Sequence, residues 1–179
     1  LDRKIRIPRP NKEAAKDICA RYLSPDLPLA PEVVAEQGSP EAAAAWLIHE
    51  LIEEMYSRKP ENELFEITFA DGSQKILYRR DFSSGAIIAN IVNRAKFAAV
   101  KDLITTGRKG IRLEHLLAAM QAEYQESEDL PGGTNPAEWA RIIGQRGERV
   151  IRVRSLQRRP RRAAETFADQ ETVALDSLL

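Results

Sequence analysis

The stretch from Asp81 to Gly107 is the longest uninterrupted helical pattern in the chain, and it constrains the fold most. Ser83 and Ser84 are both good N-cap residues, and Gly107 is a natural residue for the C-terminal cap. Apolar residues recur on one stripe with the helical spacing i, i+3, i+4 and i+7, at Ile88, Ile91, Val92, Ala95, Ala99 and Leu103. Three more apolar side chains lie on other faces, at Phe97, Val100 and Ile104. The pattern therefore predicts one long helix that is largely buried.

The first turn of this helix, Ser84-Gly85-Ala86, carries almost no side chain. Backbone N–H groups at the positive end of a helix could therefore come close to a ligand. Ordinary capping with close packing would produce the same three residues. The motif alone does not decide between a binding site and a cap.

The remaining patterns predict helices with a small amount of strand. We expect helices from Asn11 to about Leu23, from Ser39-Pro40 to about Arg58 and from Arg112 to about Glu128, with a short helix around Trp139, Ile142 and Ile143. Three prolines, Pro25, Pro28 and Pro31, should keep the loop between the first two helices extended. Two strand patterns flank Asp71-Gly72, which predicts a β-hairpin over residues 63–79, and Val150, Ile151 and Val153 indicate a final strand. The fold class is mainly α with a small β component.

Composition excludes several classes of protein. Lysines and arginines number 27 and so do the acidic residues, so net charge gives no general drive towards nucleic acid or an anionic membrane. No apolar run approaches the roughly 20 residues that span a bilayer. The single cysteine, Cys19, excludes an internal disulfide and should be a small buried residue on a helix. We expect a cytoplasmic protein, and the first residue, Leu1, suggests a fragment of a longer one.

Several kinds of catalytic motif are missing. The sequence has neither Gly-x4-Gly-Lys-Ser/Thr nor Gly-x-Gly-x-x-Gly, so it cannot hold a triphosphate in those ways. His49 and His115 are on separate predicted helices without an evident ligand cluster, so both should be structural, and we expect no metal site and no catalytic residue. The basic run Arg146–Arg162 could bind phosphates, but it lacks interleaved aromatic residues and precedes an acidic tail. A solvated strand edge with a linker is the preferred interpretation.

Several segments taken together resemble a known family. Residues Leu1 to Pro10 followed by a helix resemble the end of the large domain of AAA ATPases, and Ser84-Gly85-Ala86 resembles the lid element that closes on adenine. The closest similarity is to the actinobacterial proteasomal ATPases. It is carried by residues 81–86 and 90–96, by Glu128-Asp129-Leu130-Pro131, Thr134-Asn135-Pro136, Trp139-Ala140-Arg141-Ile142 and Gly147-Glu148-Arg149.

The resemblance implies a domain organisation and a function. Residues 1–10 would end the large AAA domain, 11–156 would form the helical lid with its inserted hairpin, and 157–179 would be a flexible tail. The parent protein would be a homo-hexameric ATP hydrolase that unfolds proteins tagged with a ubiquitin-like modifier and delivers them to the 20S proteasome. By position, Ile18 and Tyr22, together with Ser84, Gly85 and Ala86, would enclose the adenine of ATP.

The sequence also departs from the family pattern. Many AAA lids have an acid directly after Gly-Ala, where this chain has Ile87. The phosphate-binding loop and the Mg²⁺-binding strand would lie before Leu1, so the fragment alone should not hydrolyse ATP. Proteasome docking would fall to the last residues, Ser177, Leu178 and Leu179, although gate-opening members have a tyrosine where Leu178 stands. Two alternatives stay open, a nucleic-acid-binding module that uses Arg146–Arg162 and a purely structural oligomerisation domain.

Overall fold

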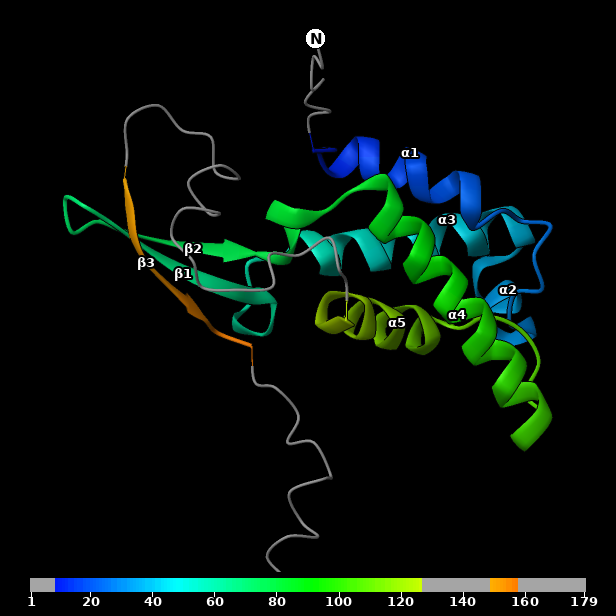
Figure 1. Ribbon diagram of the computed structural model, residues 1–179. Helices are drawn as coiled ribbons and strands as arrows, with labels where there is room; N and C mark the ends of the chain where they lie inside the picture. The colour runs from blue at the N-terminus through cyan, green and yellow to red at the C-terminus, as the bar shows by residue number, and fades with distance from the viewer. Residues whose placement is uncertain (1–8, 127–148, 158–179) are drawn as a thin grey trace, which may run out of the picture.

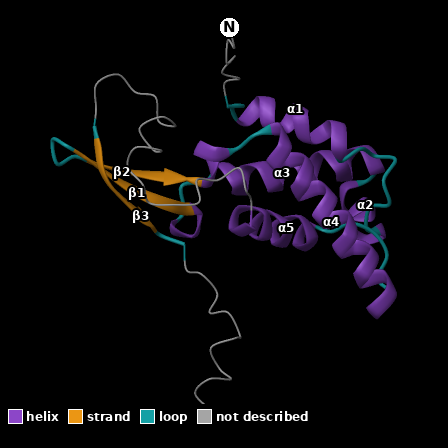
Figure 2. Ribbon diagram, viewed as in Figure 1, coloured by secondary structure: helices purple, strands orange, loops and turns teal. Residues whose placement is uncertain are grey.

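A computed structural model describes residues 9–126 and 149–157, and it confirms a mainly α fold with a small antiparallel sheet (Figures 1 and 2). The helices pack together as a bundle, and the sheet lies beside them. Among the described residues, the α-helices are α1 (Lys12–Tyr22), α2 (Pro31–Gln37), α3 (Pro40–Tyr56), α4 (Gly85–Thr106) and α5 (Leu113–Glu126). Two short 3-10 helices are η1 (Pro60–Asn62) and η2 (Arg79–Phe82).

Three of the helices begin at side-chain caps. Asn11, Ser39 and Ser84 each accept a hydrogen bond from the backbone N–H three residues further on, at Ala14, Ala42 and Ile87. Each bond satisfies a donor that has no acceptor inside the helix. The caps predicted at Asn11 and Ser39 are confirmed, and Ser84 rather than Ser83 caps α4.

Helix α2 was not predicted. The prolines of the preceding loop suggested an extended segment, but Pro31 is the first residue of α2, where a fixed φ and a missing N–H cost nothing. Gly38 ends the helix in the left-handed conformation with φ 95°. In the loop before α2, Leu29 forms an isolated parallel β-bridge with Ile111. This bridge joins the segment entering α2 to the segment entering α5.

The core of the bundle forms between α1, α3, α4 and α5. The predicted inner face of α3 is confirmed, because Leu47, Ile48, Leu51, Ile52, Met55 and Tyr56 are all buried. Burying each such large side chain stabilises the fold by about 1.5–3 kcal/mol. Cys19 of α1 is fully buried among these helices, as expected, and burial raises the pKa of its thiol to about 12.

Helix α4 is buried only along its first part. Ile88, Ile91, Val92, Ala95 and Ala99 lie in the core, and Gly107 caps the helix in the left-handed conformation, as predicted. The prediction that the helix is largely buried is wrong for its last turns, where Phe97 and Ile104 are each 78% exposed, Val100 54% and Leu103 42%. Phe97 and Val100 lie off the buried stripe, whereas Leu103 and Ile104 belong to the C-terminal part of α4, which extends beyond the other helices (Figure 1).

The sheet consists of three antiparallel strands in the order β2-β1-β3. The predicted hairpin is confirmed, with β1 (Glu63–Phe69) and β2 (Gln74–Tyr78) joined around Asp71 and Gly72. Strand β3 (Val150–Ser155) confirms the predicted final strand and pairs with β1, so that Ile67 lies opposite Val153. The ring of Phe65 meets that of Phe82 edge to face at 5.7 Å, which joins the sheet to the segment before α4.

One predicted element, the short helix with Trp139, Ile142 and Ile143, lies outside the described residues. The proposed tail from residue 157 is likewise almost entirely outside them. In the part of the chain that the structure describes, no helix has the length and apolar character needed to cross a membrane.

Candidate functional site

The first turn of α4 lies directly against α1. A Cβ atom placed on Gly85 would come within 4.0 Å of Ile18 Cγ2, so a side chain at this position would point at Ile18. Ile18 and Gly85 are half-buried, and Ala86 is exposed. The structure therefore brings Ile18 close to the distant pair Gly85-Ala86, and all three were predicted as site residues.

Tyr22 and Ser84 flank this contact. Tyr22 follows Ile18 by four residues on α1, which places both on one side of the helix, and its side chain is 40% exposed. Ser84 keeps its hydroxyl engaged as the cap, accepting from Ile87 N at 3.2 Å. In this arrangement Ser84 shapes the helix start, while Tyr22 offers an accessible aromatic face.

The chemistry of this surface follows from its parts. The half-buried Ile18 and the bare backbone at Gly85 form an apolar contact without side-chain bulk. The N–H groups of the first helical turn have no acceptor within the helix and carry part of the positive end of the dipole. A flat, weakly polar ring that accepts hydrogen bonds fits such a surface.

Ser83, predicted as a possible cap, has a different place. Its side chain is fully buried, and its Oγ lies 2.7 Å from the hydroxyl oxygen of Tyr56 at the end of α3. Sequence reasoning missed this pair because the two residues are 27 positions apart in different elements. The second serine before a glycine-initiated helix was the only local signal that one hydroxyl had another role.

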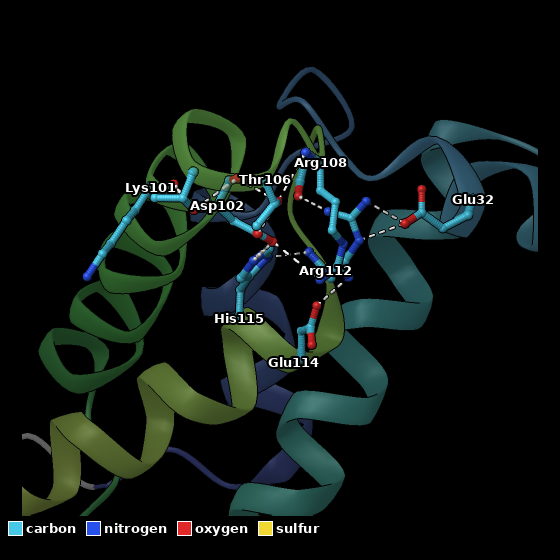
Figure 3. A network of polar contacts seen from close by, with 10 residues as sticks. Glu32, Lys101, Asp102, Thr106, Arg108, Arg112, Glu114 and His115 are labelled. Atoms are coloured by element: carbon cyan, nitrogen blue, oxygen red, sulfur yellow. Dashed lines mark hydrogen bonds and ion pairs between the residues drawn. The ribbon is translucent and has the colours of Figure 1, made fainter.

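A polar cluster at the other end of α4 surrounds His115. No ligand cluster was expected near it, yet His115 Nε2 lies 3.1 Å from Asp102 Oδ2, and Glu114 is also within reach (Figure 3). The reason is packing, since the turn after Gly107 places the start of α5 beside the last turns of α4. The Thr106 hydroxyl is the main cause that holds the pKa of Asp102 below its ordinary value, and His115 adds to it.

This cluster does not suit a metal ion. The backbone N–H of Arg112 donates to His115 Nδ1 at 3.0 Å, which leaves the ring proton on Nε2, where it can donate to Asp102. Binding a cation through Nε2 would remove that proton. Arg108 already supplies positive charge, 2.6 Å from Glu114 and 3.6 Å from Asp102. The geometry instead ties the end of α4 to the start of α5.

The other predicted functional segments are only partly visible. Ser177, Leu178 and Leu179, predicted for proteasome docking, lie outside the described residues. From the basic run, the structure describes Arg149, Arg152 and Arg154, and Arg154 donates to Glu66 of the neighbouring strand at 3.0 Å. That ion pair agrees with the interpretation of this segment as a solvated strand edge. It also neutralises Arg154, one of the cations that would otherwise be available to a nucleic acid.

Comparison with known proteins identifies the family to which the chain belongs. Residues 10–176 match the family model described as ARC, AAA+ ATPase lid domain. The chain is 51% identical to the proteasome-associated ATPase of Acidothermus cellulolyticus over 157 residues, which is 87% of this chain and 27% of the relative. It is 52% identical to that of Thermomonospora curvata over the same shares of both chains, and 47% identical to that of Kineococcus radiotolerans over 97% of this chain and 30% of the relative. The chain thus spans less than a third of the length of these relatives.

Proposed function

Because the chain belongs to the ARC AAA+ ATPase lid domain family, we propose that it closes over the adenine of ATP in a ring-forming proteasomal ATPase. Ile18 and Tyr22 of α1 would form, together with Gly85 and Ala86 of α4, one surface that contacts the base. Ser84 would hold the first turn of α4 in place through its capping bond.

One observation carries this proposal, the direct apposition of Gly85 and Ile18 across two helices. With glycine at this point the backbone of α4 is bare beside Ile18, so a planar base could pack over both residues, whereas a large side chain would cover this surface. Tyr22, at 40% exposure, is accessible for stacking. The N–H groups of the first turn of α4 could donate to ring nitrogens of the base.

Hydrolysis itself belongs elsewhere in this proposal. The chain covers between 27% and 30% of the three relatives named above, so we assign the phosphate-binding, Mg²⁺-binding and hydrolytic residues to the rest of the full-length protein. This chain would bind and orient the base, and it would exclude water from it. Bundle helices that share one core can transmit nucleotide state as a rigid body.

The wider biological role follows by analogy with the relatives. They are proteasome-associated ATPases, and we propose that the full-length protein forms a cytoplasmic homo-hexamer that unfolds proteins carrying a ubiquitin-like modifier and passes them to a 20S proteasome. Docking would use the terminal residues Ser177, Leu178 and Leu179. Removing Leu178 and Leu179 should then reduce proteasome stimulation, and unchanged stimulation would refute docking through this end.

The adenine contact is tested by filling the space at Gly85. In the full-length protein, Gly85→Trp should weaken ATP binding at least about tenfold, which corresponds to about 1.4 kcal/mol. Ala118→Trp is the matched control, because Ala118 is an exposed residue on α5 and the substitution also places an indole on a helix surface. Unchanged affinity in Gly85→Trp, or an equal loss in both variants, would contradict the proposed site.

A further inference from the structure

Beneath the first turn of α4, two buried hydroxyl groups meet. Tyr56 is the last residue of α3 and is 6% exposed, and Ser83 is fully buried. The Tyr56 hydroxyl donates to the carbonyl oxygen of Pro10 at 2.5 Å and also lies 2.7 Å from Ser83 Oγ. A buried hydroxyl is seldom neutral for stability, because it costs free energy unless it is hydrogen-bonded.

These contacts join the starts of the two helices that carry the proposed adenine site. Pro10 directly precedes the cap of α1, and Ser83 directly precedes the cap of α4. Tyr56 therefore connects the segment entering α1, which bears Ile18, with the segment entering α4, which bears Gly85.

Two arginines close the same junction from outside. Arg9 donates to the Ser83 carbonyl at 3.5 Å, and its guanidinium lies 5.4 Å from the centre of the Phe82 ring. The guanidinium of Arg80 lies 5.8 Å from the centre of the Tyr56 ring. Such cation–π contacts are attractive and add to the packing around the junction.

The hydroxyls of Tyr56 and Ser83 have two protons between them but three possible hydrogen bonds, to Pro10, to each other and to Arg80. When Tyr56 donates to Pro10, Ser83 can donate to the Tyr56 oxygen. When Tyr56 instead donates to Ser83, Ser83 can donate to the carbonyl of Arg80, which is 3.0 Å away. The bond to Pro10 can therefore open without leaving either hydroxyl proton unpaired.

We propose that Tyr56 is a positioning residue of the nucleotide site, whose hydroxyl holds the segments entering α1 and α4 together through Pro10 and Ser83. The proposal rests on the adenine site proposed above. Without the hydroxyl, the arrangement that places Ile18 against Gly85 is less populated, and affinity for nucleotide falls in proportion. Because a single hydrogen bond is involved, the loss should be about three- to tenfold.

The test compares two tyrosines in the full-length protein. Tyr56→Phe removes the hydroxyl and keeps the ring, and it should raise the dissociation constant of a fluorescent ATP analogue and the KM for ATP by about three- to tenfold. The kcat should change less than about twofold, because Tyr56 has no role in the chemical step. Tyr124→Phe is the control, since the hydroxyl of Tyr124 is buried and has no hydrogen-bond partner among the described residues.

Each further outcome decides the matter. Ser83→Ala should weaken binding in the same direction, and the double variant should be no weaker than Tyr56→Phe alone, since both residues act through one junction. Should Tyr56→Phe not fold, Ser83→Ala decides by the same readouts. Unchanged affinity in Tyr56→Phe, in an assay where Gly85→Trp binds weakly, would overturn the positioning role alone. Unchanged affinity in Gly85→Trp would overturn the adenine site and this inference with it.

Discussion

Replacing Arg94 should destabilise the chain more than replacing its partner Glu123. Glu123 of α5 is 3% exposed and accepts from Arg94 Nε at 2.8 Å and from Asn90 Nδ2 at 3.0 Å, both from α4. Arg94 is 38% exposed and also reaches Glu126 at 3.0 Å. Each helix thus contributes to the pair, but only the carboxylate is buried.

The difference in burial between Glu123 and Arg94 determines how much each substitution should lower the free energy of unfolding. Arg94→Met leaves a buried carboxylate without its cation, a defect that costs about 3–5 kcal/mol when both groups are buried. Because Arg94 is partly exposed and Asn90 remains as a donor, we expect the lower end, about 2–3 kcal/mol. Glu123→Gln keeps the shape and an acceptor for Asn90, and Arg94 retains water and Glu126, so its cost should be about 1 kcal/mol.

Urea unfolding of the chain, followed by circular dichroism, measures these free energies. The melting temperature should fall by about 5–10 °C in Arg94→Met. Lys101→Met is the control on the same helix, because its exposed ammonium group forms no ion pair in the described part of the chain. The double variant Arg94→Met/Glu123→Gln should be more stable than Arg94→Met alone. A cost below about 1 kcal/mol for Arg94→Met, or a double variant less stable than it, would refute the reasoning.

Two further predictions concern single residues in the bundle. A Cβ on Gly110 would lie 2.5 Å from backbone atoms of Leu29 and Ala30, whereas one on Gly107 would meet nothing within 4 Å, and both residues have positive φ. Gly107→Ala should therefore lower the free energy of unfolding by only about 1–2 kcal/mol, through backbone strain, and Gly110→Ala should lower it clearly more. Equal losses of the two variants in urea unfolding would contradict the clash at Gly110. The buried Cys19 thiol, with its pKa raised to about 12, should not react with a thiol reagent at pH 8 until the chain unfolds. Rapid labelling of the native chain would show the burial to be wrong. Above the ordinary thiol pKa of about 8.5, the thiol ionises in the unfolded chain but stays protonated in the folded one, so the free energy of unfolding should fall as the pH rises.

Local signals explain what could be predicted from the sequence. Asn11 and the pair Ser39-Pro40 act within one helical turn, so their caps were readable without knowledge of the fold. The turn at Asp71-Gly72 likewise depends on two residues, and Gly72 has the expected positive φ of 84°. The apolar face of α3 repeats over a whole helix, so its burial was also predictable.

Contacts between distant segments explain what was missed. Periodicity identifies an apolar stripe but not the length of the neighbouring helices, so the exposure of Leu103, which is on that stripe, could not be foreseen. The neighbours of His115 depend on how the turn after Gly107 folds back. The junction of Tyr56 with Ser83 joins three segments, and no spacing rule connects them.

The same limit applies to the candidate site. Family resemblance selected Ile18 and Gly85, but their contact is a property of helix packing. The small first turn of α4 was readable as a feature, whereas its position opposite an apolar side chain of α1 was not. A binding surface built from two helices becomes visible only once both are placed.

Photoaffinity labelling tests the central claim most directly. The full-length protein would be irradiated with an azido-adenine analogue of ATP, and the labelled peptides would be identified by mass spectrometry. We predict label on the segments that contain Ile18 to Tyr22 and Ser84 to Ala86, with protection by unmodified ATP. Protected label found only in other segments of the protein would contradict the claim that this lid contacts adenine.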